Sequence, residues 1–119
     1  MASEIHPVVA GQPTGKRVYT ITYTKADGSP GEIEAPPVPT LSDTSLATVN
    51  DEGLVSPGVF QASVVHNGAN GVVIMTFSQV DGDLGAGVFP IGPFDEQITM
   101  LAPLGATAGV VAAGDETAP

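Results

Sequence analysis

The chain of 119 residues contains no cysteine, and aromatic residues make up only 5% of it. A disulfide framework, a zinc site built on thiolates and a cysteine nucleophile are therefore excluded. The fold must be held together by the packing of side chains alone. The scarcity of aromatic rings also leaves few groups that could position a sugar or another flat substrate.

Positive charge is almost as scarce as cysteine. The three basic residues are Lys16, Arg17 and Lys25, and the formal net charge is -10. Of the 13 acidic residues only Glu4 precedes Lys25, so 12 acidic and no basic residues follow it. Binding to phosphates needs clustered cations, so we expect neither nucleic acid nor an anionic membrane surface as a partner. The basic N-terminal region could instead meet an acidic partner or the acidic body of a second copy.

Long hydrophobic runs are missing as well. No stretch approaches the roughly 20 apolar residues of a membrane span. The first residues, MASEIHPVVAG, have neither the cationic start nor the apolar core of a secretory signal. The sequence therefore predicts either a protein that is made and used without Sec export, which we favour, or one from which a leader has been removed.

Hydrophobic residues, at 42%, are plentiful enough for a core, and the chain also has 15 glycines and 11 prolines. This combination favours a single all-β domain with many turns. Strict alternation in RVYTITYTK predicts a strand at 17–25, which returns through residues 32–35 as a hairpin. Further strands are predicted at 45–50, 54–55, 59–66, 72–80 and 94–101.

The alternation also predicts which side chains face the core. On residues 17–25 the inward set is Tyr19, Ile21 and Tyr23; a sugar-stacking platform is the alternative reading of the two tyrosines. The next two inward sets are Phe60, Ala62, Val64 and Val73, Met75, Phe77. PPVPT at 36–40 cannot form a central strand, because proline lacks the N–H donor, and we read it as an edge crossing between two sheets.

One stretch resembles a known family. SLATVNDEGLV, followed by PGVFQASV, is similar to the bacterial immunoglobulin-like group 2 domains. The matching positions are Ala47, Thr48, Val49, Gly53, Leu54, Val55 and Gly58. The resemblance covers about a third of the chain and implies an immunoglobulin-like antiparallel β-sandwich. The alternative is the irregular β fold of trimeric capsid decoration proteins.

No catalytic constellation is recognisable in the sequence. Nucleophile-elbow, P-loop and dinucleotide motifs are absent, so we predict no catalytic residues, no cofactor and no metal site. His6 and His66 are interpreted as surface residues. The Asp81-Gly82-Asp83 sequence is typical of an acidic turn, since the remaining ligands of a calcium loop do not follow it.

We expect an extended N-terminal arm at residues 1–15, a β-sandwich domain at 16–101 and a C-terminal tail at 102–119. The leading hypothesis is a non-enzymatic structural protein that decorates or cements the exterior of a tailed-bacteriophage capsid, made in the host cytoplasm. Its partners would be the major capsid protein or further copies of itself, for example in a trimer. The alternative is a bacterial cell-surface adhesion or carbohydrate-binding module from a larger protein.

The residues predicted to bind the partner lie in the N-terminal arm, at the start of the β-sandwich domain and in the C-terminal tail. Val8, Val9, Val110 and Val111 would bury apolar surface, and Lys16 and Arg17 would set the register by charge complementarity.

Overall fold

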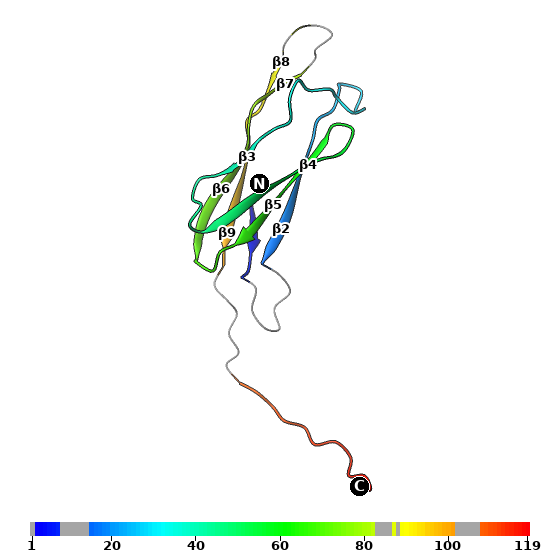
Figure 1. Ribbon diagram of the computed structural model, residues 1–119, viewed down its shortest axis with the longest axis vertical. Helices are drawn as coiled ribbons and strands as arrows, with labels where there is room; N and C mark the ends of the chain where they lie inside the picture. Colours follow the sequence, from blue (N-terminus) through cyan, green and yellow to red (C-terminus); the bar gives the residue numbers. More distant parts are fainter. Residues whose placement is uncertain (1, 8–14, 83–86, 88, 102–107) are drawn as a thin grey trace.

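The computed structural model describes residues 2–7, 15–82, 87, 89–101 and 108–119. These residues form an all-β structure, as the sequence predicts (Figure 1). The nine strands of the described part are β1 (Ala2–Ile5), β2 (Lys16–Thr22), β3 (Pro39–Leu41), β4 (Ala47–Ser56), β5 (Val59–His66), β6 (Gly71–Phe77), β7 (Val80–Gly82), β8 (Phe89–Ile91) and β9 (Phe94–Met100).

The strands form two main sheets and one short ribbon. One sheet has the order β1-β9-β6-β3, the other has the order β2-β5-β4, and β7 pairs with β8 alone. All pairs are antiparallel except β1 with β9, which is parallel. The β7–β8 ribbon continues the β6–β9 pair beyond one end of the two sheets (Figure 1).

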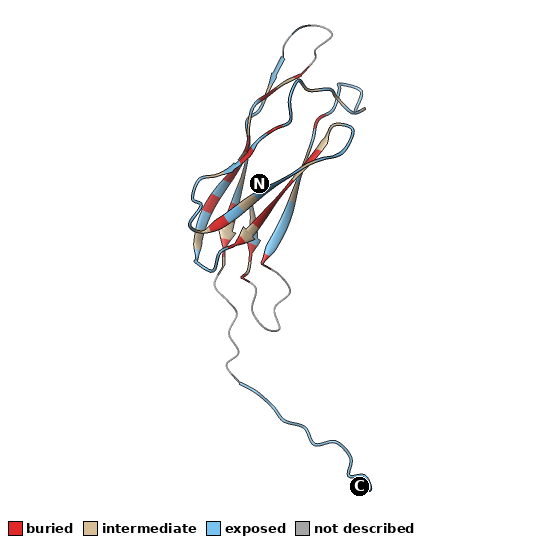
Figure 2. Ribbon diagram, viewed as in Figure 1, coloured by how far each residue is buried: buried red, intermediate tan, exposed pale blue. Residues whose placement is uncertain are grey.

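A single core lies between the two sheets, whose inner faces are the buried parts of the strands in Figure 2. The sheet of β2, β5 and β4 contributes small residues, among them Ala47, Ala62 and Val64. The other sheet contributes longer ones, including Met75 and Ile98. Small residues on one inner face and longer ones on the other allow two twisted sheets to pack closely. Among the described residues, the core holds Phe77 as its one buried aromatic residue and contains no disulfide.

The predicted inward faces are confirmed on β5 and β6, which lie in different sheets. Phe60, Ala62 and Val64 on β5 are buried. Val73, Met75 and Phe77 on β6 are buried too, and the alternating residues Val72 and Ile74 are exposed. On β2, Tyr19 and Ile21 are half-buried against this core, and Tyr23, just after the end of β2, is buried in the second cluster described below.

Several local expectations are wrong. The strands predicted at 45–50 and 54–55 form the single strand β4, and the strand predicted at 72–80 ends at Phe77. The predicted N-terminal arm is not separate from the domain, because Ala2–Ile5 forms β1 beside β9 and Ile5 is fully buried. The predicted hairpin between residues 17–25 and 32–35 is not formed either, because β2 pairs with β5. After Tyr23 only the isolated bridge between Thr24 and Pro30 continues that turn. For β1 and β2 the true partner lies far along the chain, where local patterns carry no signal.

A second, smaller cluster fills the end of the molecule near the ribbon. Tyr23, Phe60 and Val80 are its buried members, with Ile33 and Ile91 packed against them. The rings of Tyr23 and Phe60 meet edge to face, with their centroids 6.0 Å apart. The hydroxyl of Tyr23 is buried there without a hydrogen-bond partner among the described residues. Burial raises the pKa of Tyr23, and burial also raises that of Tyr19.

Two glycines of the β4–β5 hairpin can be compared: Gly53 lies within β4, beside a register shift, and Gly58 lies in the turn between the two strands. Gly53 and Gly58 both have positive φ angles, 75° and 74°. A Cβ at Gly58 would lie 2.7 Å from the carbonyl oxygen of Tyr23, whereas a Cβ at Gly53 would meet nothing within 4 Å. We expect Gly53→Ala to lower the free energy of unfolding by about 1 kcal/mol, from backbone strain alone. Gly58→Ala should lower it by about 3 kcal/mol or more, because a backbone clash is added. Equal losses in urea denaturation would contradict the packing described for Gly58.

The buried tyrosines predict a loss of stability at alkaline pH. Their pKa values are raised above the ordinary 10.0 in the folded protein, so the unfolded chain releases these protons first as the pH rises. The free energy of unfolding should therefore be unaffected below about pH 9 and decline above about pH 10. Urea denaturation at a series of pH values measures this decline. Tyr23→Phe, which removes one of the two groups, should show a smaller decline; an unchanged one would contradict the role of Tyr23.

Candidate functional site

Lys16 and Arg17, the two basic residues predicted to bind a partner, lie at the beginning of β2 and are exposed. The guanidinium of Arg17 reaches across to β1, where its Nε and Nη2 donate to the carbonyl oxygen of Glu4 at 3.1 and 2.9 Å. Beside it, the hydroxyls of Ser3 and Tyr19 are 2.6 Å apart. Arg17 and Tyr19 thus connect the two sheets along one side of the molecule. Sequence reasoning assigned Arg17 to a partner, and did not foresee this internal role.

The four valines predicted to bury apolar surface against a partner lie in two different segments of the chain. Val8 and Val9 lie outside the described residues. Val110 and Val111 lie in the segment 108–119, which we call the tail; every residue of it is exposed, and these two side chains are 95% and 96% exposed. The tail extends away from the sheets (Figure 1), so the chain does not bring its valines to its own Lys16 and Arg17. Its length explains the radius of gyration of 20.8 Å, against about 13–14 Å for a compact chain of this size.

His66 is the functional-looking residue that sequence reasoning placed wrongly. We expected a surface residue, but its side chain is buried and hydrogen-bonded at both ring nitrogens. The N–H of Gly68 donates to Nδ1 at 2.8 Å, so Nδ1 carries no proton. Nε2 therefore carries the proton and donates to the carbonyl oxygen of Leu101 at 2.8 Å. The alternation of residues in β5 did not predict this burial. A histidine at the end of a strand fits the same sequence pattern whether its side chain is exposed or buried and hydrogen-bonded.

The bonds of His66 join three chain segments at one end of the molecule. Its backbone N–H donates to the carbonyl oxygen of Gly15, just before β2, at 2.7 Å. Its side chain holds Gly68 in the β5–β6 loop and Leu101 just after β9. The start of β2 and the end of β9 consequently lie side by side. The point at which the chain leaves β9 toward the tail is therefore fixed close to Lys16.

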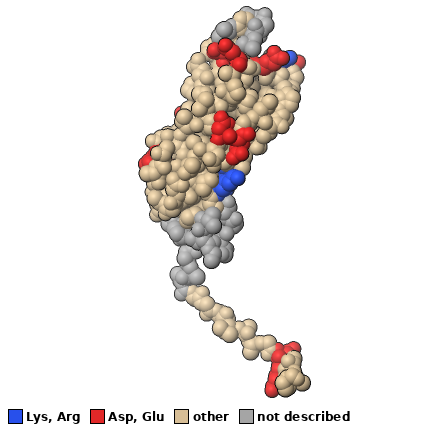
Figure 3. Space-filling model, in the orientation of Figure 1, with Lys and Arg blue, Asp and Glu red and all other residues tan. Residues whose placement is uncertain are grey.

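The acidic residues are distributed over the body and the far end of the tail (Figure 3). Several of them build turns. Asp27 accepts hydrogen bonds from the hydroxyl and the backbone N–H of Ser29, and Asp43 accepts the same pair from Ser45. These bonds, the hydroxyl first, hold the pKa values of both carboxyl groups below their usual range. The acids of these turns are thus explained by local structure, as their positions in the sequence suggest.

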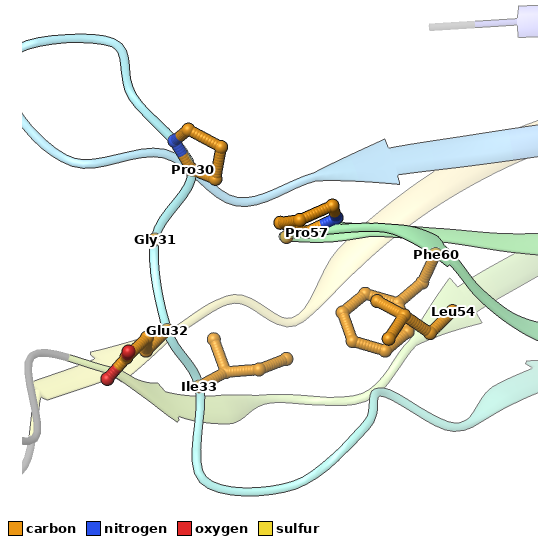
Figure 4. A pocket seen from close by; sticks show the side chains of 8 residues that line it. Pro30, Gly31, Glu32, Ile33, Leu54, Pro57 and Phe60 are labelled. Atoms are coloured by element: carbon orange, nitrogen blue, oxygen red, sulfur yellow. The ribbon is translucent and has the colours of Figure 1, made fainter.

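One open pocket of about 400 Å³ lies beside the smaller cluster. It is lined by Pro30, Gly31, Glu32, Ile33, Leu54, Pro57, Gly58 and Phe60. Figure 4 shows the side chains of Ile33, Leu54 and Phe60 turned toward one another, with the carboxyl group of Glu32 pointing away. Binding pockets for small molecules combine an apolar lining with a few convergent polar groups. The apolar lining is present here, and the pocket offers a small hydrophobic contact surface.

Among the described residues, with their gaps at 8–14, 83–86, 88 and 102–107, no group of three or more histidine, aspartate or glutamate side chains could hold a metal ion. No helix of the length and apolar character needed to cross a bilayer occurs in that same part of the chain. Comparison with protein-family models, with curated proteins and with solved structures gives no match for this chain.

The bonds of His66 predict a measurable loss of stability on substitution. His66→Leu keeps a side chain of similar size and removes both hydrogen bonds of the ring. The carbonyl oxygen of Leu101 and the N–H of Gly68 then lose their bonds to residue 66. We expect the free energy of unfolding to fall by about 1–3 kcal/mol in urea denaturation. The matched control is His6→Leu, at a half-buried position, for which a change below about 1 kcal/mol is expected. Nitrogen chemical shifts that indicate a proton on Nδ1 of His66 would contradict the arrangement.

Proposed function

We propose that the two sheets form an immunoglobulin-like sandwich. Such folds place strands A, B, E and D in one sheet and C, F and G in the other. With β1 to β6 as A to F and β9 as G, the observed sheets read B-E-D and A-G-F-C. The first strand pairs with G in place of B, and the β7–β8 ribbon extends the hairpin between F and G. This order, together with the resemblance of residues 45–64 to group 2 domains, supports the proposal.

The function that we propose is structural: the protein decorates or cements the exterior of a tailed-bacteriophage capsid. The observation that carries an interaction role is the tail, whose apolar residues are almost fully exposed. Exposed apolar side chains in an extended segment gain most when a partner covers them. A strongly acidic surface keeps an abundant exterior protein soluble until it meets its particle. The capsid itself is proposed from composition, since small decoration proteins are short, acidic, free of cysteine and rich in glycine and proline.

The proposal predicts binding to phage heads that depends on the tail. Heads of the phage whose genome carries this sequence, prepared without the protein, would be mixed with the purified chain and sedimented. We expect the full chain to bind until a fixed number of copies per head is reached. A chain that ends at residue 101 should bind at least about tenfold more weakly, because the apolar residues of the tail are gone.

Two controls make this experiment decisive. Lys25→Ala changes one exposed residue far from β2's beginning and should bind like the unaltered chain. Thermal unfolding of the shortened chain should remain cooperative, which separates lost binding from lost folding. If the full chain ignores the heads and binds whole bacteria or immobilised glycans, the capsid proposal is wrong and the adhesion module takes its place.

A further inference from the structure

The edges of the two sheets differ in how well they are protected. An edge strand presents N–H and C=O groups that can pair with another strand. β4 lies at one edge, and its pairing with β5 is interrupted by register shifts between Asp51 and Gly53 and between Leu54 and Ser56. Asp51 and Glu52 add negative charge to this strand, and their carboxylates accept hydrogen bonds from the N–H of Gly53 and the hydroxyl of Ser63. Bulges and charges of this kind discourage the addition of a further strand.

The edge strand β2 has neither a register shift nor acidic side chains. All seven of its residues pair with β5 without a register shift, so the strand is regular from Lys16 to Thr22. In the order β2-β5-β4 it is the end strand, so its outer edge faces no further strand in the described part of the chain. Its charged residues, Lys16 and Arg17, are both positive. Among the edge strands described, β2 is therefore the one that combines a regular backbone with positive charge.

The tail has the complementary properties. Its first seven residues, Ala108–Gly114, are apolar or small, and Asp115 and Glu116 follow them. Its described residues carry no positive charge, and all of them are exposed. A seven-residue uncharged segment matches the seven residues of β2 in length. The acidic pair beyond it would meet the basic residues at one end of that strand.

We propose that the segment Ala108–Gly114 of one copy of the protein adds as an antiparallel strand to the outer edge of β2 in a second copy. In this register Gly114 lies opposite Lys16 and Ala112 opposite Val18. Asp115 and Glu116 then lie just beyond Lys16. The small side chain of Ala113 falls opposite Arg17, which needs room because it reaches across to β1.

The direction of the strands requires a second copy. Through His66, the end of β9 at Leu101 is held beside the start of β2. A tail that turned back onto its own β2 would run parallel to it and carry its acids toward Thr22, away from the cations. To run antiparallel it would first have to travel from the level of Lys16 to that of Thr22, about 20 Å, cross to the outer edge of β2 and then reverse its direction. The seven Cα–Cα steps from Leu101 to Ala108 reach at most about 25 Å when fully extended, which leaves too little chain for the crossing and the reversal. We therefore assign the antiparallel strand to another molecule.

Engineered cysteines test this contact directly, because the chain has none of its own. A chain with Val18→Cys would be mixed with a chain with Ala112→Cys under mild oxidation. The control pairs Ala112→Cys with Asn50→Cys, which lies in the same cross-strand row as Val18, on the opposite edge strand of the sheet. We expect a disulfide between the two chains at Val18 at least about tenfold faster than at Asn50. Equal rates at the two positions would overturn the proposal.

Sedimentation of the cysteine-free protein supplies the second test. The full chain should self-associate in a concentration-dependent manner, and a chain without residues 108–119 should remain monomeric. Lys16→Glu should weaken association by about three- to tenfold at low salt, and adding Glu116→Lys to the same chain should restore it. Association that survives removal of the tail, or a charge exchange that restores nothing, would overturn the proposal. Both results concern contacts between copies, so they stand apart from binding to a capsid.

Discussion

The close approach of the two sheets is the constraint on which the rest of the structure depends. With no disulfide and few aromatic rings, the protein holds its sheets together mainly by packing aliphatic side chains and methionines, with Phe77 in the core and Tyr19 packed against it. Ala47 and Ala62 on one inner face and Met75 and Met100 on the other belong to the same buried cluster. Where the two sheets meet at β1 and β2, the bonds of Arg17 and Ser3 join them along the side of the molecule.

The parts of the fold that the sequence could predict are those with local signals. Alternation located β5 and β6 and assigned their inner faces correctly, because burial of one face imposes a period of two on a strand. The turn before β5 was signalled by its Pro57-Gly58 pair, whereas the break predicted between residues 50 and 54 lies inside β4. β1 was missed, since four residues before a proline have no pattern of their own and gain their role only from β9 at the other end of the chain.

The candidate site follows the same division. Composition and charge could predict that Val110 and Val111 are exposed and that Lys16 lies at the start of a strand. The internal bonds of Arg17 and His66 were not, because each joins residues far apart in sequence: Arg17 with Glu4, and His66 with Leu101. The burial of His66 shows the physical reason. A histidine tolerates the interior when both ring nitrogens are satisfied, and the groups that satisfy them can be identified only after the chain has folded.

The parallel pairing of β1 with β9 has a mechanical consequence. A load applied to residues beyond Leu101 acts along the axis of β9, whereas its hydrogen bonds to β1 and β6 lie across that axis. The ladder on each side is therefore loaded in shear, and its bonds must yield together. A hairpin pulled from its open end yields one bond at a time and gives way at a much smaller force. Because β9 lies between β1 and β6, such a load would be shared by two ladders of hydrogen bonds.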